Sequence, residues 1–392
     1  MRFVIINTDY PAFLEHLYWQ HPGLAQRSYA DQMQVRMASL FGVADFYSYN
    51  LRQLGHEVWE LHPNNNRLQA AWAQEHNLPL ARRPRRLAPA WLAAARTAAA
   101  LGRRLPKRIG RFINRRLGDP AAFRIDEDLL AAQVRHYRPD VLLNHAILEI
   151  GGTFLGRVRS EVGHIIGQHA ATSLPADLDL SCYELMLSSF PATISELARR
   201  GLSARPFQLG FEPRVLEHLS SGPPQYEVSF VGSFQAIHAS RTAWMERLCE
   251  QLPQIRIWAP SLEGLAAHSP IRRHYVGPAW GLRMYQILRQ SRITLNHHGN
   301  VPHYANNMRL YEATGVGSLL ITDQRENLRE MFEPGQEVIS FSSTTECRDQ
   351  IVYYLEHEQE RALVARRGQT RTLQTHTYLQ RMQELVGIVQ RL

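Results

Sequence analysis

A group of polar side chains precedes an apolar strand pattern in the second half of the chain. They fall on one short predicted helix: Asn306, Asn307, Arg309 and Glu312. A helix start offers free backbone N–H groups and a partial positive charge, which suit a phosphate. Arg309 would add a cation, and an ionised carboxylate such as Glu312 accepts hydrogen bonds from vicinal hydroxyls like those of a ribose. The group therefore predicts a nucleoside-diphosphate site.

A purely structural interpretation of the same stretch stays open. Arg309 and Glu312 are three residues apart and would share a helix face as an exposed salt bridge, worth well under ~1 kcal/mol. Gly315 would then end the helix in the left-handed conformation. This interpretation explains the glycine, but it explains less well why the following strand, Ser318–Thr322, is apolar enough to be central in a sheet.

Two series of short apolar strands alternate with helical patterns, which is typical of parallel sheets covered by helices. We expect the first series at residues 3–7, 57–61, 141–145, 164–168, 185–189 and 206–209, and the second at 228–232, 255–258, 274–276, 293–296, 318–322 and 338–341. Among the helices we expect one at 32–54 and a long helical tail from 359 to 392. Because residues 210–226 contain Ser-Ser-Gly-Pro-Pro, we interpret them as a linker. The sequence predicts an α/β protein with two doubly wound domains that face a cleft.

Polar residues follow most of these strands, at the edge where parallel sheets bind their ligands. In the second half they include Gly232, Ser233, Asn296 and His298, and His238 lies just beyond the glycine loop. We expect these five to contact the diphosphate or its nucleoside. In the first half, Asp9, His169 and His145 are candidates for the base that deprotonates an acceptor hydroxyl, and Asp9 is the first choice. Strand ends also face water and carry polar residues for that reason alone.

Two Asp-x-Asp pairs have the spacing with which some transferases hold a divalent metal on a diphosphate. Asp126 and Asp128 begin a predicted helix, where the helix dipole stabilises carboxylates. Asp177 and Asp179 lie in a loop flanked by proline. We interpret both pairs as structural. The sequence therefore predicts no metal ligand and no cofactor, with positive helix ends and arginines stabilising the leaving group in place of an ion.

The net charge of +8 in 392 residues comes from one segment. Arg82–Arg116 holds twelve basic residues and no acidic one. An apolar stripe beside its arginines suits contact with an anionic membrane surface or a lipid-linked acceptor, or else an insertion that packs on its own domain. Since few aromatic residues interrupt the segment, we do not expect nucleic-acid binding. Three scattered cysteines and the absence of a long apolar run indicate a cytoplasmic protein, peripheral at the inner face of the membrane at most.

The motifs NNMRLYEATGVGSLLITD, ENLREMFEPGQEV and GQTRTLQTHTYLQRM resemble the CgeB-like glycosyltransferases of the GT-B superfamily. This resemblance implies two Rossmann-like domains, 1–212 with a basic insertion at 82–117 and 225–375, with a C-terminal helix at 376–392 that packs back on the first. It implies that the second domain binds a UDP-, GDP- or dTDP-sugar. The first would bind a glycan, lipid-linked or protein acceptor, in the synthesis of a bacterial surface or spore-type glycan.

By the same resemblance, Glu312 matches the second glutamate of the E-x7-E pattern of retaining GT-B enzymes, which contacts the nucleotide ribose. Tyr304 stands where the first glutamate would be, so the stereochemical outcome and the contact with the donor sugar stay open. The loop containing Gly232 and Ser233 matches the position that approaches the donor diphosphate. Two alternatives to a transferase remain: a nucleotide-sugar epimerase of the same fold, and a non-catalytic module that binds nucleotide-sugars or glycans.

Overall fold

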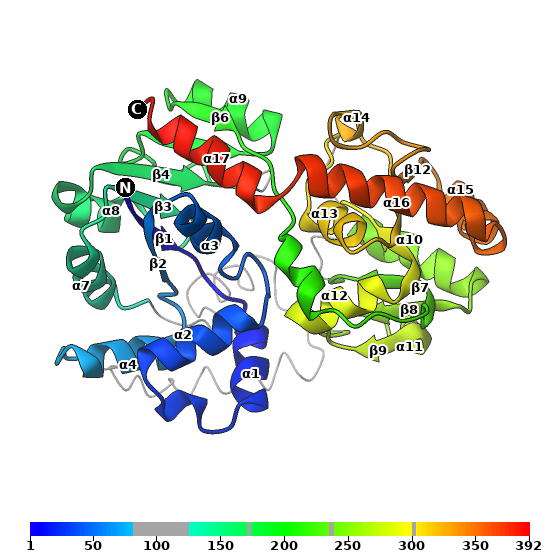
Figure 1. Cartoon of the computed structure of the whole chain (residues 1–392), viewed down its shortest axis with the longest axis horizontal. Helices are drawn as coiled ribbons and strands as arrows, with labels where there is room; N and C mark the ends of the chain where they lie inside the picture. Colours follow the sequence, from blue (N-terminus) through cyan, green and yellow to red (C-terminus); the bar gives the residue numbers. More distant parts are fainter. Residues whose placement is uncertain (81–124, 171–173, 235–238, 300–302) are drawn as a thin grey trace, which may run out of the picture.

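The first half of the molecule is built on a six-stranded parallel sheet (Figure 1). The computed structural model describes residues 1–80, 125–170, 174–234, 239–299 and 303–392. The first sheet has the order β2-β1-β3-β4-β5-β6, in which every neighbouring pair is parallel. Its strands are β1 (Arg2–Ile6), β2 (Glu57–Leu61), β3 (Val141–Asn144), β4 (His164–Gln168), β5 (Leu185–Ser188) and β6 (Ala204–Pro206).

A second parallel sheet of six strands follows, in the order β12-β11-β10-β7-β8-β9. Its strands are β7 (Tyr226–Val231), β8 (Ile255–Trp258), β9 (Tyr275–Gly277), β10 (Ser291–Asn296), β11 (Leu319–Asp323) and β12 (Ile339–Phe341). The central strands are buried along nearly their whole length, because helices cover both faces. The predicted α/β class with two doubly wound sheets is confirmed, and the strand bounds agree with the expected ones within three residues.

Helices connect the strands in both halves. Beside the first sheet lie α1 (Pro11–Gln20), α2 (Tyr29–Ala38), α3 (Phe46–Gln53), α4 (Asn66–Glu75), α7 (Glu127–Tyr137), α8 (Gly152–Val158) and α9 (Pro191–Arg199), with short 3-10 turns at 24–26, 159–161 and 213–218. Beside the second lie α10 (Ala239–Gln251), α11 (Ile271–His274), α12 (Gly281–Arg289), α13 (Met308–Gly315), α14 (Leu328–Met331), α15 (Thr344–Glu356) and α16 (Glu358–Thr375). The last helix, α17 (Tyr378–Val389), returns to the first half. Within the described part of the chain, no helix combines the length and apolar character needed to cross a membrane.

The single helix expected at 32–54 is wrong. The structure has two helices there, α2 and α3, because Leu40 and Ala44 adopt left-handed backbone conformations with φ of 54° and 36°. This turn buries Leu40, which is 5% exposed. The expected tail is also broken, since Thr377 and Gln380 form a capping box that starts α17. The side chains of a capping box satisfy the free N–H groups of a new helix start, and the Thr-x-x-Gln spacing is its sequence signal.

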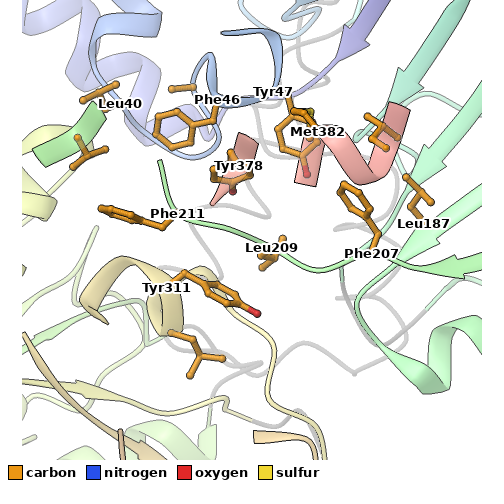
Figure 2. Close-up of a cluster of buried hydrophobic side chains, with 14 of the residues drawn as sticks. Leu40, Phe46, Tyr47, Leu187, Phe207, Leu209, Phe211, Tyr311, Tyr378 and Met382 are labelled. Atoms are coloured by element: carbon orange, nitrogen blue, oxygen red, sulfur yellow. The ribbon is translucent and has the colours of Figure 1, made fainter. Parts of the chain in front are cut away.

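The two halves share one apolar cluster, part of which Figure 2 shows. Two chain segments cross between the halves side by side: Phe211 N donates to His376 O at 2.8 Å, and Tyr378 N donates to Phe211 O at 2.9 Å. Beyond this crossing, α17 packs against α3 of the first half, as Figure 1 also shows. The last helix therefore ties the end of the chain to the first sheet.

Candidate functional site

The start of α13 is tied to the carboxyl ends of two central strands. Asn307 caps the helix, because its side-chain oxygen accepts from Leu310 N at 3.3 Å. Its amide Nδ2 donates to Asn296 Oδ1 at 2.9 Å, and Asn296 Nδ2 donates in turn to Thr322 Oγ1 at 2.9 Å. The free N–H groups of an eight-residue helix thus point toward the ligand edge of the sheet, where the sequence places a phosphate.

Arg309 and Glu312 form a buried ion pair on this helix, with 2.8 Å between Nη1 and Oε2. Arg309 Nη2 also donates to Val231 O at 3.2 Å, so the guanidinium sits at the end of β7. Burial raises the pKa of Glu312, while Arg309 and a hydrogen bond from Tyr285 act in the opposite direction. The interpretation as an exposed salt bridge is therefore wrong, because both side chains are enclosed where the strands end.

The glycines after α13 have roles other than the expected cap. The C-cap residue is Val316, and Gly317 has the left-handed φ of +85°. A Cβ on Gly315 would lie 2.5 Å from the ring of Phe211. Gly315 is therefore required by close packing against the crossing segment, and the left-handed turn occurs two residues later than expected.

The glycine loop after β7 is shaped by its own neighbours. Gly232 N donates to Trp258 O at 3.0 Å, and a Cβ on Gly232 would lie 2.8 Å from the Phe230 ring. The need for glycine here therefore arises from packing, whatever ligand the loop also meets. His238, which the sequence assigns to the diphosphate, lies outside the described residues.

Arg241 supplies a second cation at the same edge. Its Nε and Nη2 donate to His297 O at 3.0 and 2.7 Å, and its Nη1 donates to Ser233 O at 3.3 Å. Burial lowers the pKa of Arg241 to about 10, so the side chain stays charged at neutral pH. Arg241 joins the loops after β7 and β10. Its position at the start of a helix beyond a glycine loop was the only signal for it in the sequence.

His298 and Asp323 form a second buried pair at the ends of β10 and β11. His298 Nδ1 lies 2.6 Å from Asp323 Oδ1, and Arg325 Nη2 donates to Asp323 Oδ2 at 2.5 Å. Burial alone would raise the pKa of Asp323, but His298, His297 and Arg325 hold it well below its usual range. Asp323 therefore stays ionised and orients His298. A hollow of about 570 Å³ opens beside it, lined by residues that include Gln324, Arg325 and Arg329.

Asp9 is enclosed in an ionic cluster at the end of β1. Its carboxylate meets Arg36 Nη2 at 2.6 Å and His62 Nδ1 at 3.0 Å, and all three side chains are at most 3% exposed. Burial alone would raise the pKa of Asp9, but Arg36 and His62 hold it well below its usual range. A base must reach its substrate and accept a proton. The structure instead gives Asp9 the contacts of a residue that fixes the β1–α1 loop.

His145 directly follows β3 and is half-buried. Its ring packs edge-on against Tyr47 with centroids 4.7 Å apart, and burial lowers its pKa to about 4. The imidazole is therefore neutral at pH 7 but a weak proton acceptor. Within the described residues, its Nε2 has no hydrogen-bond partner.

His169 lies where the two halves come together. The preceding residue, Gln168, exchanges hydrogen bonds with the Tyr47 hydroxyl. The residue after His169 is Ala170, whose carbonyl oxygen accepts a hydrogen bond from Asn306 Nδ2 at 3.5 Å, just before α13. Of the three candidate bases, His169 is thus the one next to a described contact between the first half and the start of α13.

The carboxylates of both Asp-x-Asp pairs have local partners. Asp126 caps α7 by accepting from Leu129 N at 3.1 Å. Asp179 Oδ1 accepts from the backbone N and the hydroxyl of Ser181 at 3.0 and 2.7 Å. These contacts agree with the structural interpretation of both pairs.

Comparisons with known proteins agree with this architecture. Residues 240–387 match a family model described as glycosyl transferase-like. Among solved structures, HepE from Anabaena in complex with UDP-glucose is similar over 100% of both chains, with a TM-score of 0.56 and 11% identity. Sucrose-phosphate synthase from Thermosynechococcus elongatus has a TM-score of 0.56 and 11% identity, over 100% of this chain and 98% of that one.

A third similar structure is AviGT4, a glycosyltransferase involved in avilamycin A biosynthesis, with a TM-score of 0.54 and 15% identity over 100% of this chain and 98% of that one. No curated protein sequence matches the chain. The fold is GT-B, as the sequence predicts. The match to the family model contains Arg241, His298, α13 and Asp323, whereas Val231, Gly232 and Ser233 precede it.

Proposed function

We propose that the protein is a glycosyltransferase that moves a hexose-type sugar from a nucleoside-diphosphate donor to an acceptor hydroxyl. The observation that carries this proposal is the buried Arg309–Glu312 pair at the start of α13, inside the glycosyl transferase-like match. The donor binds at the carboxyl edge of the second sheet. The acceptor, a glycan, lipid-linked or protein hydroxyl, binds to the first half.

The donor side provides fixed positive charge for the departing diphosphate. Arg309 and Arg241 are both held by backbone carbonyl groups, at Val231 for the first and at His297 and Ser233 for the second. Cations that are already in place stabilise charge that develops in the transition state, because they need no reorganisation. We propose that these side chains and the N–H groups of α13 bind the diphosphate without a metal ion. Glu312 then meets the ribose.

On the acceptor side, we propose His169 as the proton acceptor if the reaction inverts. Its position beside the contact of Ala170 with Asn306 supports this assignment over His145 and Asp9. In this proposal Asp9 is a positioning residue, since its carboxylate is occupied by Arg36 and His62.

The motifs around α13 support a CgeB-like enzyme of bacterial glycan synthesis that acts in the cytoplasm. The basic segment Arg82–Arg116, which lies outside the described residues, would contact an anionic membrane or a lipid-linked acceptor.

A thermal-shift screen against UDP, GDP, dTDP and CMP tests the donor assignment, since a ligand that binds the folded state raises the melting temperature. The protein is then incubated with nucleotide-sugars that contain whichever nucleotide raised the melting temperature. Nucleoside diphosphate whose release depends on an added acceptor, which gains the sugar, identifies a transferase, and an isomerised nucleotide-sugar that keeps its diphosphate identifies an epimerase. Binding without turnover identifies a non-catalytic module, and no binding by any of the four nucleotides contradicts the proposal.

A further inference from the structure

The first turn of α12, in the second half, lies against the end of α2, in the first. Leu282 N donates to Ser39 O at 2.9 Å. A Cβ on Gly281 would lie 1.9 Å from the same oxygen, and Gly281 has a φ of +49°. A side chain at position 281 is therefore excluded both by the neighbouring carbonyl and by the backbone conformation.

This contact satisfies free backbone groups of two helices at once. Ser39 is the C-cap of α2, whose last carbonyls have no partner within the helix, and Leu282 lies in the first turn of α12, whose N–H groups are equally free. The carbonyl end of one helix dipole meets the N–H end of another, which is the favourable arrangement. The edge-on contact of Phe41 with Trp280, at 5.0 Å between ring centroids, lies beside it.

The two helices also carry residues of both proposed half-sites. On α2, Arg36 holds Asp9, and the Ser39 hydroxyl donates to Arg36 O at 2.6 Å. On α12, Met284 Sδ lies 3.3 Å from Arg309 Nη2, and Tyr285 hydrogen bonds to Glu312. A displacement of α12 relative to α2 would therefore move the donor side relative to the end of β1.

A hollow of about 330 Å³ lies between α1, α2 and α12, and Ser39, Trp280 and Leu282 are among its lining residues. Beside it, Trp280 packs against the first half through Phe13 and Phe41, with ring centroids 6.2 and 5.0 Å apart. The hydrogen bond and the close approach at Gly281 fix the register of this contact.

We propose that the contact between Ser39 and Gly281–Leu282 sets the alignment of the donor side with the acceptor side, so that Gly281 is a positioning residue for sugar transfer. This inference rests on the proposed function. It separates two steps: nucleotide binding needs the second half alone, whereas transfer needs both halves in register.

The test compares Gly281→Ala with Gly264→Ala. Gly264 has a similarly positive φ of +84° in the same half, but its Cβ would meet nothing within 4 Å, so it controls for backbone strain. We expect Gly281→Ala to bind the nucleotide selected by the UDP, GDP, dTDP and CMP screen within about twofold of the wild type. Its kcat should fall at least tenfold, and its radius of gyration in X-ray scattering should rise. Gly264→Ala should change neither.

A second pair of variants tests the same contact if Gly281→Ala does not fold. Leu282→Pro removes the N–H donor at a helix position that tolerates proline, and Leu282→Ala removes the side chain but keeps the donor. We expect only Leu282→Pro to lose kcat and widen the scattering profile. Wild-type kcat and scattering in Gly281→Ala or Leu282→Pro overturn the inference and leave the proposed function standing. A wild-type protein that binds none of the four nucleotides overturns the proposed function, and the scattering comparison still decides whether the contact aligns the halves.

Discussion

Arg309 and Glu312 lie one helical turn apart on α13 and pair at 2.8 Å, with their side chains only 13% and 7% exposed. The guanidinium also donates to Val231 O, the last carbonyl of β7. A surface pair of this spacing would be mobile and screened by salt. Here the pair holds a cation in one place at the carboxyl edge of the sheet, before any ligand arrives.

Replacing Arg309 with glutamine should weaken binding of both pyrophosphate and the nucleoside diphosphate by about 1.5–3 kcal/mol, the usual value of a hydrogen bond to a charged group. Glu312→Gln keeps a partner for Tyr285 but removes the carboxylate. Glu312→Gln should weaken binding of the nucleoside diphosphate more than binding of pyrophosphate, because only the nucleotide has a ribose. Isothermal titration with both ligands measures these differences.

Arg361→Gln is the matched control, since Arg361 pairs with Glu358 at the same three-residue spacing on α16. It should leave both affinities unchanged. If Arg309→Gln folds and binds pyrophosphate as the wild type does, the diphosphate is not bound at this helix.

Gly315→Ala should destabilise the fold by about 1–3 kcal/mol, because the added methyl group would overlap the Phe211 ring in a filled core. The control is Gly156→Ala in α8, where the nearest atom, Cys182 Sγ, lies at 4.0 Å. That change should be neutral or stabilising by up to about 1 kcal/mol, since alanine favours helices over glycine. Urea unfolding measures both, and equal effects of the two changes would refute the packing explanation of Gly315.

The strands and their order in the chain could be predicted because a buried parallel strand has a nearly continuous apolar pattern and the ends of such strands carry polar residues. The helix at 32–54 could not be divided correctly, because the left-handed turn at Leu40 and Ala44 depends on burial of Leu40 in a core shared with the second half. Single-sequence patterns contain no information on such a distant contact.

In the candidate site too, local features could be predicted from the sequence and long-range contacts could not. The α13 group was visible as local spacing, whereas the partners of Asp9 were not, since Arg36 and His62 reach it from separate elements. A carboxylate after a strand has the same sequence signal whether it faces a substrate or a buried arginine and histidine. The ranking of Asp9 above His169 as a base therefore lacked the information that the tertiary contacts provide.

Asp9 should contribute stability that depends on pH. Its pKa is lowered in the folded state, so its contribution is present above the ordinary carboxyl value near 4 and is lost as the pH falls below it. Asp9→Asn leaves Arg36 without its anion, while His62 keeps Glu60 at 3.8 Å, and should cost about 3–5 kcal/mol at pH 7. The difference from the wild type should narrow steadily from pH 5 to pH 3 in urea unfolding.

An exposed carboxylate provides the comparison for Asp9. Asp128 has a side chain that is 84% exposed, so Asp128→Asn should stay close to the wild type at every pH. A difference between Asp9→Asn and the wild type that is the same at pH 7 and pH 3 would contradict the ionic cluster.

Transfer should persist in EDTA, because Arg241, Arg309 and the N–H groups of α13 supply the positive charge that a divalent ion supplies in other transferases. Turnover of the donor that the nucleotide screen selects is measured before and after chelation, and again after Mn²⁺ is added. Activity that vanishes with EDTA and returns with Mn²⁺ would show that a metal ion takes part.

Hydrogen–deuterium exchange with and without saturating nucleoside diphosphate tests the central claim most directly, since it locates the ligand without knowledge of the acceptor. The ligand should slow exchange in two regions of the second half, at the end of β10 around residues 294–298 and along α13 at 308–315. The amides of the first sheet should change far less. Unchanged exchange at both regions under saturating UDP, GDP, dTDP and CMP, or slowing confined to residues 2–206, would contradict a donor site at the start of α13.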